Sequence, residues 1–139
     1  MAKVNRDDER HELIAEWVCR LGLQGWDITV VSDCTMSDIK KILETDEVAT
    51  GACEWCTLLK TAKVAILAED EFPKIDDSVQ WMSKYDYEQT LIHELLHIKF
   101  SLLQDNIEDG FIHDWYHQQC IEDMAKALVS AKREGEKRG

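Results

Sequence analysis

Residues 93–97 read His-Glu-Leu-Leu-His and lie in an apolar stretch of helical character, and no other feature constrains the chain as strongly. Residues four apart share one face of a helix, so the imidazoles of His93 and His97 point the same way and can bind one metal ion. Glu94 is rotated from His93 by about 100°. That rotation places its carboxylate beside such an ion, as a base for a water molecule rather than as a ligand.

This motif and its setting resemble the zincins, zinc-dependent metallopeptidases that carry His-Glu-x-x-His on a helix. The resemblance runs from about Trp26 to Leu128 and is nearest to small metallopeptidases of phage and bacterial genomes. In those proteins a stretch like Ile92 to His97 precedes a closing helix with a segment like Ala125 to Leu128. The resemblance implies bound Zn²⁺, a peptide or protein substrate, a strand that borders the motif helix, and a third ligand on a later helix.

Length and composition limit the other possibilities. A chain of 139 residues predicts a single domain. No apolar run is long enough for a membrane span, and the polar N-terminus lacks the core of a signal peptide, so we expect a cytoplasmic protein. Five cysteines, an odd number, favour reduced thiols. The net charge of -12 repels phosphate backbones and argues against direct binding of nucleic acid.

The order of predicted elements indicates an α+β fold with a minimal zincin-like core. We expect a small antiparallel or mixed sheet of about three strands, with an N-terminal helix, the motif helix and a C-terminal helix. The expected segments are a helix at 7–21, a strand at 26–31, a turn at 32–35, a short helix at 36–44 capped by Ser37, strands at 48–59 and 63–68, a connection at 69–83, a motif helix at 86–103 begun by a capping box of Asp86 and Gln89, a loop at 104–110, a helix at 112–132 and a flexible tail at 133–139.

A catalytic zinc ion takes three protein ligands and keeps one open position, so a third ligand is required. The metzincin pattern is excluded, because its glycine and last histidine positions are Phe100 and Leu103. A glutamate on the next helix, as in gluzincins, would be Glu122. His113 follows the acidic, glycine-containing segment Asp109-Gly110, as in SprT-type proteases, but the other parts of that pattern are absent.

Helix geometry favours a different residue, His117. If Ile121 is set at zero, then Met124, Ala125 and Leu128 centre the buried face near about -20°. His117 lies at about -40°, inside this face, and Glu122 lies at about +100°, on its flank. We therefore predict His93, His97 and His117 as the metal ligands, with His113 and Glu122 as alternatives for the third position.

Cys53 and Cys56 form a single C-x-x-C pair, which supplies two of the four ligands of a structural zinc site. In an extended strand the two thiols face opposite sides of the sheet. We therefore interpret them as ordinary buried or edge thiols. A cysteine as third ligand, as in peptide deformylases, is the alternative.

The predicted reaction is hydrolysis of a peptide bond, with Glu94 as general base. Candidate donors to the developing oxyanion are Tyr85, Tyr87 and Tyr116, and candidates that orient a ligand imidazole are Asp114 and Asp123. The strand at 63–68 is the expected sheet edge for an extended substrate.

Two other interpretations stay open. One is a non-catalytic zinc-binding module with an interaction or regulatory function in a mobile element, and the other is a metal-free α+β domain. Glu94 argues against the module, because a purely structural zinc site does not need a base beside the ion.

Overall fold

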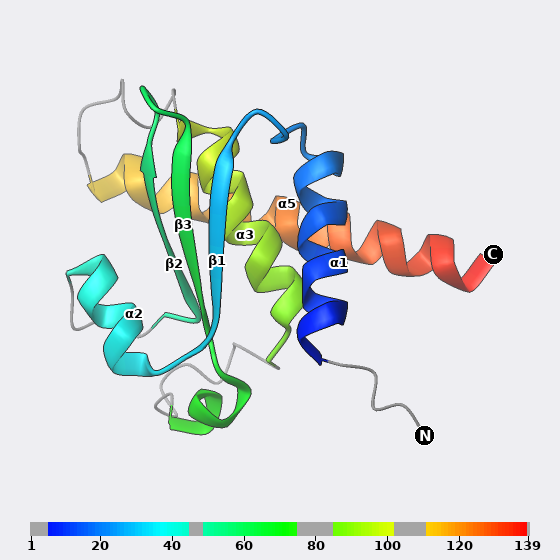
Figure 1. The fold of residues 1–139 in the computed structure, drawn as a ribbon, viewed down its shortest axis with the longest axis horizontal. Coiled ribbons are helices and arrows are strands. Elements are labelled where there is room, and N and C mark those ends of the chain that lie inside the picture. The colour runs from blue at the N-terminus through cyan, green and yellow to red at the C-terminus, as the bar shows by residue number, and fades with distance from the viewer. Residues whose placement is uncertain (1–5, 45–48, 75–84, 102–110, 139) are drawn as a thin grey trace.

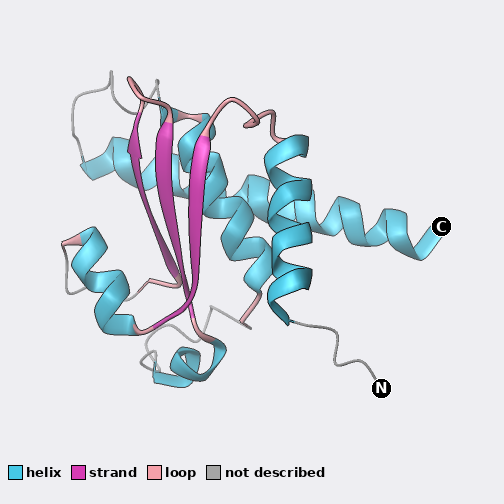
Figure 2. Cartoon of the chain, viewed as in Figure 1, coloured by secondary structure: helices cyan, strands magenta, loops and turns pink. Residues whose placement is uncertain are grey.

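The computed structural model describes residues 6–44, 49–74, 85–101 and 111–138, and it leaves out the side chains of 6–7, 73–74 and 111–116. It confirms an α+β fold in which a three-stranded mixed sheet is combined with helices at both ends of the chain (Figure 1, Figure 2). In chain order the elements are α1 (Arg6–Arg20), β1 (Asp27–Cys34), α2 (Met36–Leu43), β2 (Gly51–Cys56), β3 (Thr61–Leu67), the 3-10 helix η1 (Glu69–Lys74), α3 (Tyr87–Lys99) and α5 (Phe111–Arg138).

The sheet has the order β1-β3-β2, with β3 parallel to β1 and antiparallel to β2. The prediction that the strand at 63–68 forms a sheet edge is therefore wrong, because β3 is the central strand. Its sequence explains this position, since the run from Val64 to Ala68 is buried throughout, as is usual for a strand covered on both faces. Within the described ranges, β2 has a strand neighbour on one side only.

Alternate residues of β3 supply two hydrophobic cores. Val64 and Ile66 pack in the larger core, with apolar side chains of α1, α3 and α5, whereas Ala65 and Leu67 pack in a smaller core with Ile39 of α2. Figure 1 shows the same two layers, with α2 on one side of the sheet and α1, α3 and α5 on the other. The motif helix α3 is thus held between the sheet and α5.

Some predicted boundaries differ from the structure. The turn expected at 32–35 is instead the end of β1, which bends at a register shift where Asp33 has a φ of 58°. Thr35, not Ser37, caps α2, because its hydroxyl accepts from the amide of Asp38. Asp86 begins α3 as predicted, since its carboxylate accepts from the amide of Gln89.

The C-terminal helix is longer than predicted. α5 continues through Arg138, so residues 133–138 are helical instead of forming the expected tail. The expected loop at 104–110 and most of the connection at 69–83 lie outside the described residues. None of the described helices has both the length and the apolar character that crossing a membrane requires.

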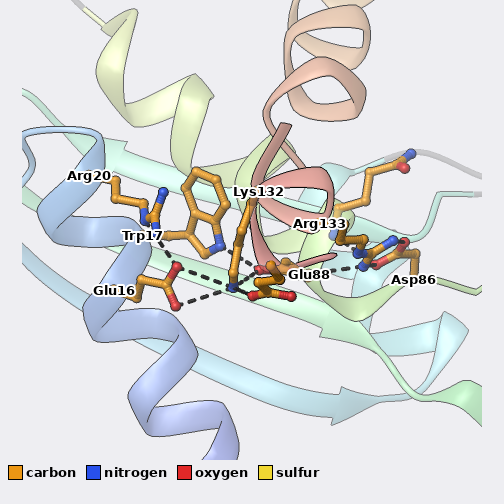
Figure 3. Close-up of polar contacts among 9 residues, drawn as sticks. Glu16, Trp17, Arg20, Asp86, Glu88, Lys132 and Arg133 are labelled. Carbon is orange, nitrogen blue, oxygen red and sulfur yellow. Dashed lines mark hydrogen bonds and ion pairs between the residues drawn. The ribbon is translucent and has the colours of Figure 1, made fainter. Parts of the chain in front are cut away.

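Helices α1, α3 and α5 meet in an ionic junction, which we define by Glu16, Trp17, Asp86, Glu88, Lys132 and Arg133 (Figure 3). The ammonium group of Lys132 donates to Glu88 and to Glu16, and the indole Nε1 of Trp17 donates to Glu88 over 2.7 Å. Arg133 donates to both carboxylate oxygens of Asp86. The junction therefore fixes the N-terminal turn of α3 against α1 and α5.

Candidate metal centre

The three polar residues of the motif come together on α3 as the sequence predicts. Ligand atoms of His93, Glu94 and His97 all lie within 4.8 Å of one another, and we call these three residues the metal cluster. The two imidazole rings have their centroids 5.1 Å apart. Glu94 and His97 are buried, each with a relative exposure of 6%. Two imidazoles in this arrangement suit a zinc ion, and they leave the Glu94 carboxylate beside it as a base.

Glu94 is seated against the backbone of β2. A Cβ atom on residue 51 would lie 2.9 Å from Thr90 Cγ2 and 3.1 Å from Glu94 Oε2, so a larger residue here would require these side chains to shift. The pKa of Glu94 is raised to about 7, chiefly by burial; the charge of His93 opposes this rise, and the nearby negative charge of Glu122 adds to it. The raised pKa suits a group that takes up and returns a proton near neutral pH.

His93 is held at both ring nitrogens by residues of α5. Glu122 Oε2 lies 2.5 Å from Nδ1, and Gln118 Oε1 lies 3.2 Å from Nε2. The other oxygen of Glu122 accepts a hydrogen bond from the side-chain amide of Gln89 over 2.8 Å. Burial opposes protonation of His93, but the hydrogen bond to Glu122 and the charge of Glu94 raise its pKa overall. The same hydrogen bond lowers the pKa of Glu122.

A carboxylate that accepts from Nδ1–H fixes the tautomer and the orientation of an imidazole, which leaves Nε2 to bind a metal ion. Glu122, offered by the sequence as an alternative third ligand, is placed to do this for His93. Of the two aspartates considered for that orienting function, Asp123 is exposed, and the side chain of Asp114 lies outside the described residues.

His97 is packed between aromatic rings. Its imidazole stacks on the indole of Trp55 from β2, with centroids 6.2 Å apart and an interplanar angle of 11°. The ring of His117 lies on α5, with its centroid 5.7 Å from that of His97, and Phe100 meets His117 edge-on. His117 is thus next to the metal cluster, although it is not part of the group whose ligand atoms lie within 4.8 Å of one another.

The buried face of α5 is centred at a different angle from the one that the sequence predicted. The buried residues Ile121, Ala125 and Val129 centre the face of α5 near about +40° from Ile121, not near about -20°. Glu122 is then about 60° from this centre and His117 about 80°, so both residues border the buried face. Both contact the motif helix, through His93 and His97 respectively. The side chain of His113, the other alternative, lies outside the described residues.

The cysteine pair does not form a joint site. Cys53 and Cys56 lie three apart on β2, with Cys53 partly buried against the larger core and Cys56 exposed. Burial and the nearby charge of Glu94 raise the pKa of the Cys53 thiol, which keeps it protonated near neutral pH. Neither cysteine belongs to the metal cluster found among the described residues.

Two of the tyrosines considered as oxyanion donors, Tyr85 and Tyr87, have other partners. The hydroxyl of Tyr85 donates to the carbonyl of Leu67 over 2.7 Å, and the hydroxyl of Tyr87 shares a hydrogen bond with Ser32. These bonds connect α3, and Tyr85 two residues before it, to the sheet. The side chain of Tyr116 lies outside the described residues.

Sequence reasoning missed three contributors to the site, namely Gly51, Trp55 and Gln118. Gly51 and Trp55 lie on the edge strand β2, and their proximity to α3 depends on the strand order, which local patterns do not reveal. Gln118 lies next to His117 and four residues before Glu122, so its face of α5 was a usable signal. Comparisons with family profiles, curated proteins and solved structures give no match for this chain.

Proposed function

We propose that this protein is a zinc-dependent peptidase that hydrolyses a peptide bond with Glu94 as general base. One observation carries the proposal: a buried carboxylate with a pKa raised to about 7 lies within 4.8 Å of ligand atoms of two imidazoles. A structural zinc site has no use for such a base, whereas hydrolysis requires one.

In this proposal His93, His97 and His117 bind the ion, and Glu122 orients His93. Zinc bound here would supply Lewis acidity, lowering the pKa of water toward roughly 7 and polarising the scissile carbonyl. Glu94 accepts a proton from the attacking water and returns it to the leaving amine. Gly51 keeps the Glu94 carboxylate in place, because its lack of a side chain lets β2 lie directly against it.

The substrate in this proposal is an extended peptide or protein segment. β2 is an edge strand within the described ranges, and it carries Trp55, which stacks on His97. An extended chain can add to such an edge through main-chain hydrogen bonds. This strand takes the place of the segment at 63–68 that the sequence suggested. A cytoplasmic location belongs to the same proposal and is supported by the five free thiols.

The test is zinc content by elemental analysis, together with cleavage of a broad peptide panel by the wild type and by Glu94→Gln. We expect one zinc per chain in both proteins and a loss of about 10²- to 10⁴-fold in kcat for the variant. Glu12→Gln is the matched control, because exposed Glu12 follows a histidine on α1 but lacks a second histidine at position 15.

Two results would contradict the proposal. A wild type that binds zinc but cleaves nothing in the panel would favour the non-catalytic zinc-binding module. A wild type that takes up no zinc from a metal-loaded buffer would remove the metal centre itself.

A further inference from the structure

Gln118 contacts the metal cluster but has no part in binding the ion or in moving a proton as described so far. Its side chain is exposed on α5, and its Oε1 lies 3.2 Å from Nε2 of His93. Glu122, one helical turn further along, is bonded to Nδ1 of the same ring. The two α5 residues therefore hydrogen-bond to the two ring nitrogens of the same imidazole.

The nitrogen that Gln118 contacts is the one that matters for metal binding. Because Nδ1 donates to Glu122, Nε2 of His93 is left to bind the ion. A carboxamide next to Nε2 therefore lies beside the position of the ion, on the side that is open to solvent. Rotation of a glutamine amide exchanges its oxygen for an NH₂ group with two donors.

We propose that Gln118 is a hydrogen-bond donor of the active site, and this rests on the proposed peptidase function. Its amide N–H donates to the carbonyl oxygen of the scissile peptide as negative charge develops there. A neutral, preorganised amide donor is well suited to this task, because it needs no proton transfer. The assignment also agrees with the hydroxyls of Tyr85 and Tyr87 being bonded to Leu67 and Ser32.

Direct coordination by Gln118 is the less favourable arrangement. Zinc in proteins selects imidazole, thiolate and carboxylate ligands, and the site already offers His93, His97 and His117. A neutral amide oxygen would add a fourth protein ligand and close the position that a catalytic site keeps open.

The experiment compares Gln118→Ala and Gln118→Glu with Gln119→Ala. Gln119 is the matched control, since it is an exposed glutamine at the next position of α5 and points about 100° away. The measurements are the affinity for Zn²⁺ alone and, by calorimetry, the affinity of each zinc-loaded protein for acetohydroxamate, whose carbonyl oxygen stands in for the oxygen of the scissile carbonyl. Cleavage of a peptide from the panel is measured in parallel.

We expect Gln118→Ala to bind Zn²⁺ within a factor of about two of the wild type and acetohydroxamate about tenfold more weakly, the loss of one hydrogen bond. Its kcat should fall by about 10²-fold with KM nearly unchanged. Gln118→Glu keeps the size of the side chain but replaces both donors with a negative charge, so it should bind Zn²⁺ at least as tightly as the wild type and acetohydroxamate more weakly than the wild type. Gln119→Ala should behave as the wild type in all three measurements.

Two outcomes would overturn the inference while the peptidase function stands. One is an acetohydroxamate affinity of Gln118→Ala equal to that of Gln119→Ala. The other is loss of zinc from Gln118→Ala, which would make Gln118 a ligand. A wild type that binds no zinc would reject both proposals, and it is recognised from the first measurement alone.

Discussion

At its N-terminal turn α3 is bound to α5 through the ionic junction, and further along it meets the same helix through the metal cluster and its neighbours. In the junction, burial alone would raise the pKa of Glu88, but hydrogen bonds from Lys132 and Trp17 lower it below its ordinary value. In the metal cluster burial prevails, and the pKa of Glu94 is raised to about 7. The junction thus stabilises its carboxylates with cations of the chain, whereas the cluster keeps a carboxylate whose charged form is unfavourable without an additional cation.

The largest expected effect lies in the ionic junction. Lys132→Ala removes the cation that pairs with Glu88, and the side chains of the two residues are only 11% and 12% exposed. A buried carboxylate that loses its cationic partner typically costs about 3–5 kcal/mol of the free energy of unfolding, and we expect the lower end of this range because Trp17 and Arg133 still donate to Glu88. Urea denaturation measures this loss, with Lys137→Ala, an exposed lysine of the same helix, as control. Equal stabilities of the two variants would show that the junction is not a buried ion pair in solution.

The second largest effect is a pH-dependent change in folding stability, which we expect from Glu94 in the metal cluster. The pKa of Glu94 is raised from 4.5 to about 7, so between these values the folded protein holds a proton that the unfolded chain has lost. Stability therefore falls as the pH rises through this window. In metal-free protein, Glu94→Gln removes this cost and should stabilise the fold by up to about 3 kcal/mol at pH 8.

The gain should disappear below pH 4.5, where Glu94 is protonated in both states. Thermal unfolding at pH 4 and pH 8 in the presence of a chelator measures it, with Glu12→Gln as the matched control. If Glu94→Gln destabilises the metal-free protein at pH 8, the charge of Glu94 is compensated in the fold and the contrast with the ionic junction does not hold.

The smallest effect concerns Glu122. If Glu122 orients His93 without binding the ion, Glu122→Gln should weaken zinc affinity by about 10- to 100-fold while a loaded protein still holds one zinc. His117→Ala should lower the zinc stoichiometry itself. Competition with a chromophoric chelator measures both, and Glu134→Gln on the exposed surface of α5 serves as control. The reverse order of effects would make Glu122 the third ligand.

The sequence predicted those parts of the molecule that depend on local patterns. The spacing within 93–97 placed three groups in one cluster, and Asp86 was identified as the cap of α3 from its distance to Gln89. The α+β class and the three strands were predicted because segments with helical spacing of apolar residues follow and precede segments with the pattern of strands.

Long-range arrangement set the limit of what could be predicted. The strand order places β2, and with it Gly51, against α3, and a local pattern does not reveal which strand lies next to a given helix. The choice between His117 and Glu122 depended on a helix face whose centre was shifted, because Val129 is buried and Met124 and Leu128 are only partly so. Lys132 was the last residue of the predicted C-terminal helix, next to the expected flexible tail, yet the packing of three helices leaves its side chain only 11% exposed.

The distribution of the site along the chain has a consequence for biosynthesis. His93, Glu94 and His97 belong to one short segment, but their partners His117 and Glu122, and the anchoring Lys132, come from α5, which leaves the ribosome after α3. Domains fold as units during translation, so a nascent chain that ends before α5 carries the motif without the residues that complete and fix it. The order of synthesis therefore delays assembly of the proposed hydrolytic centre until α5 has been made.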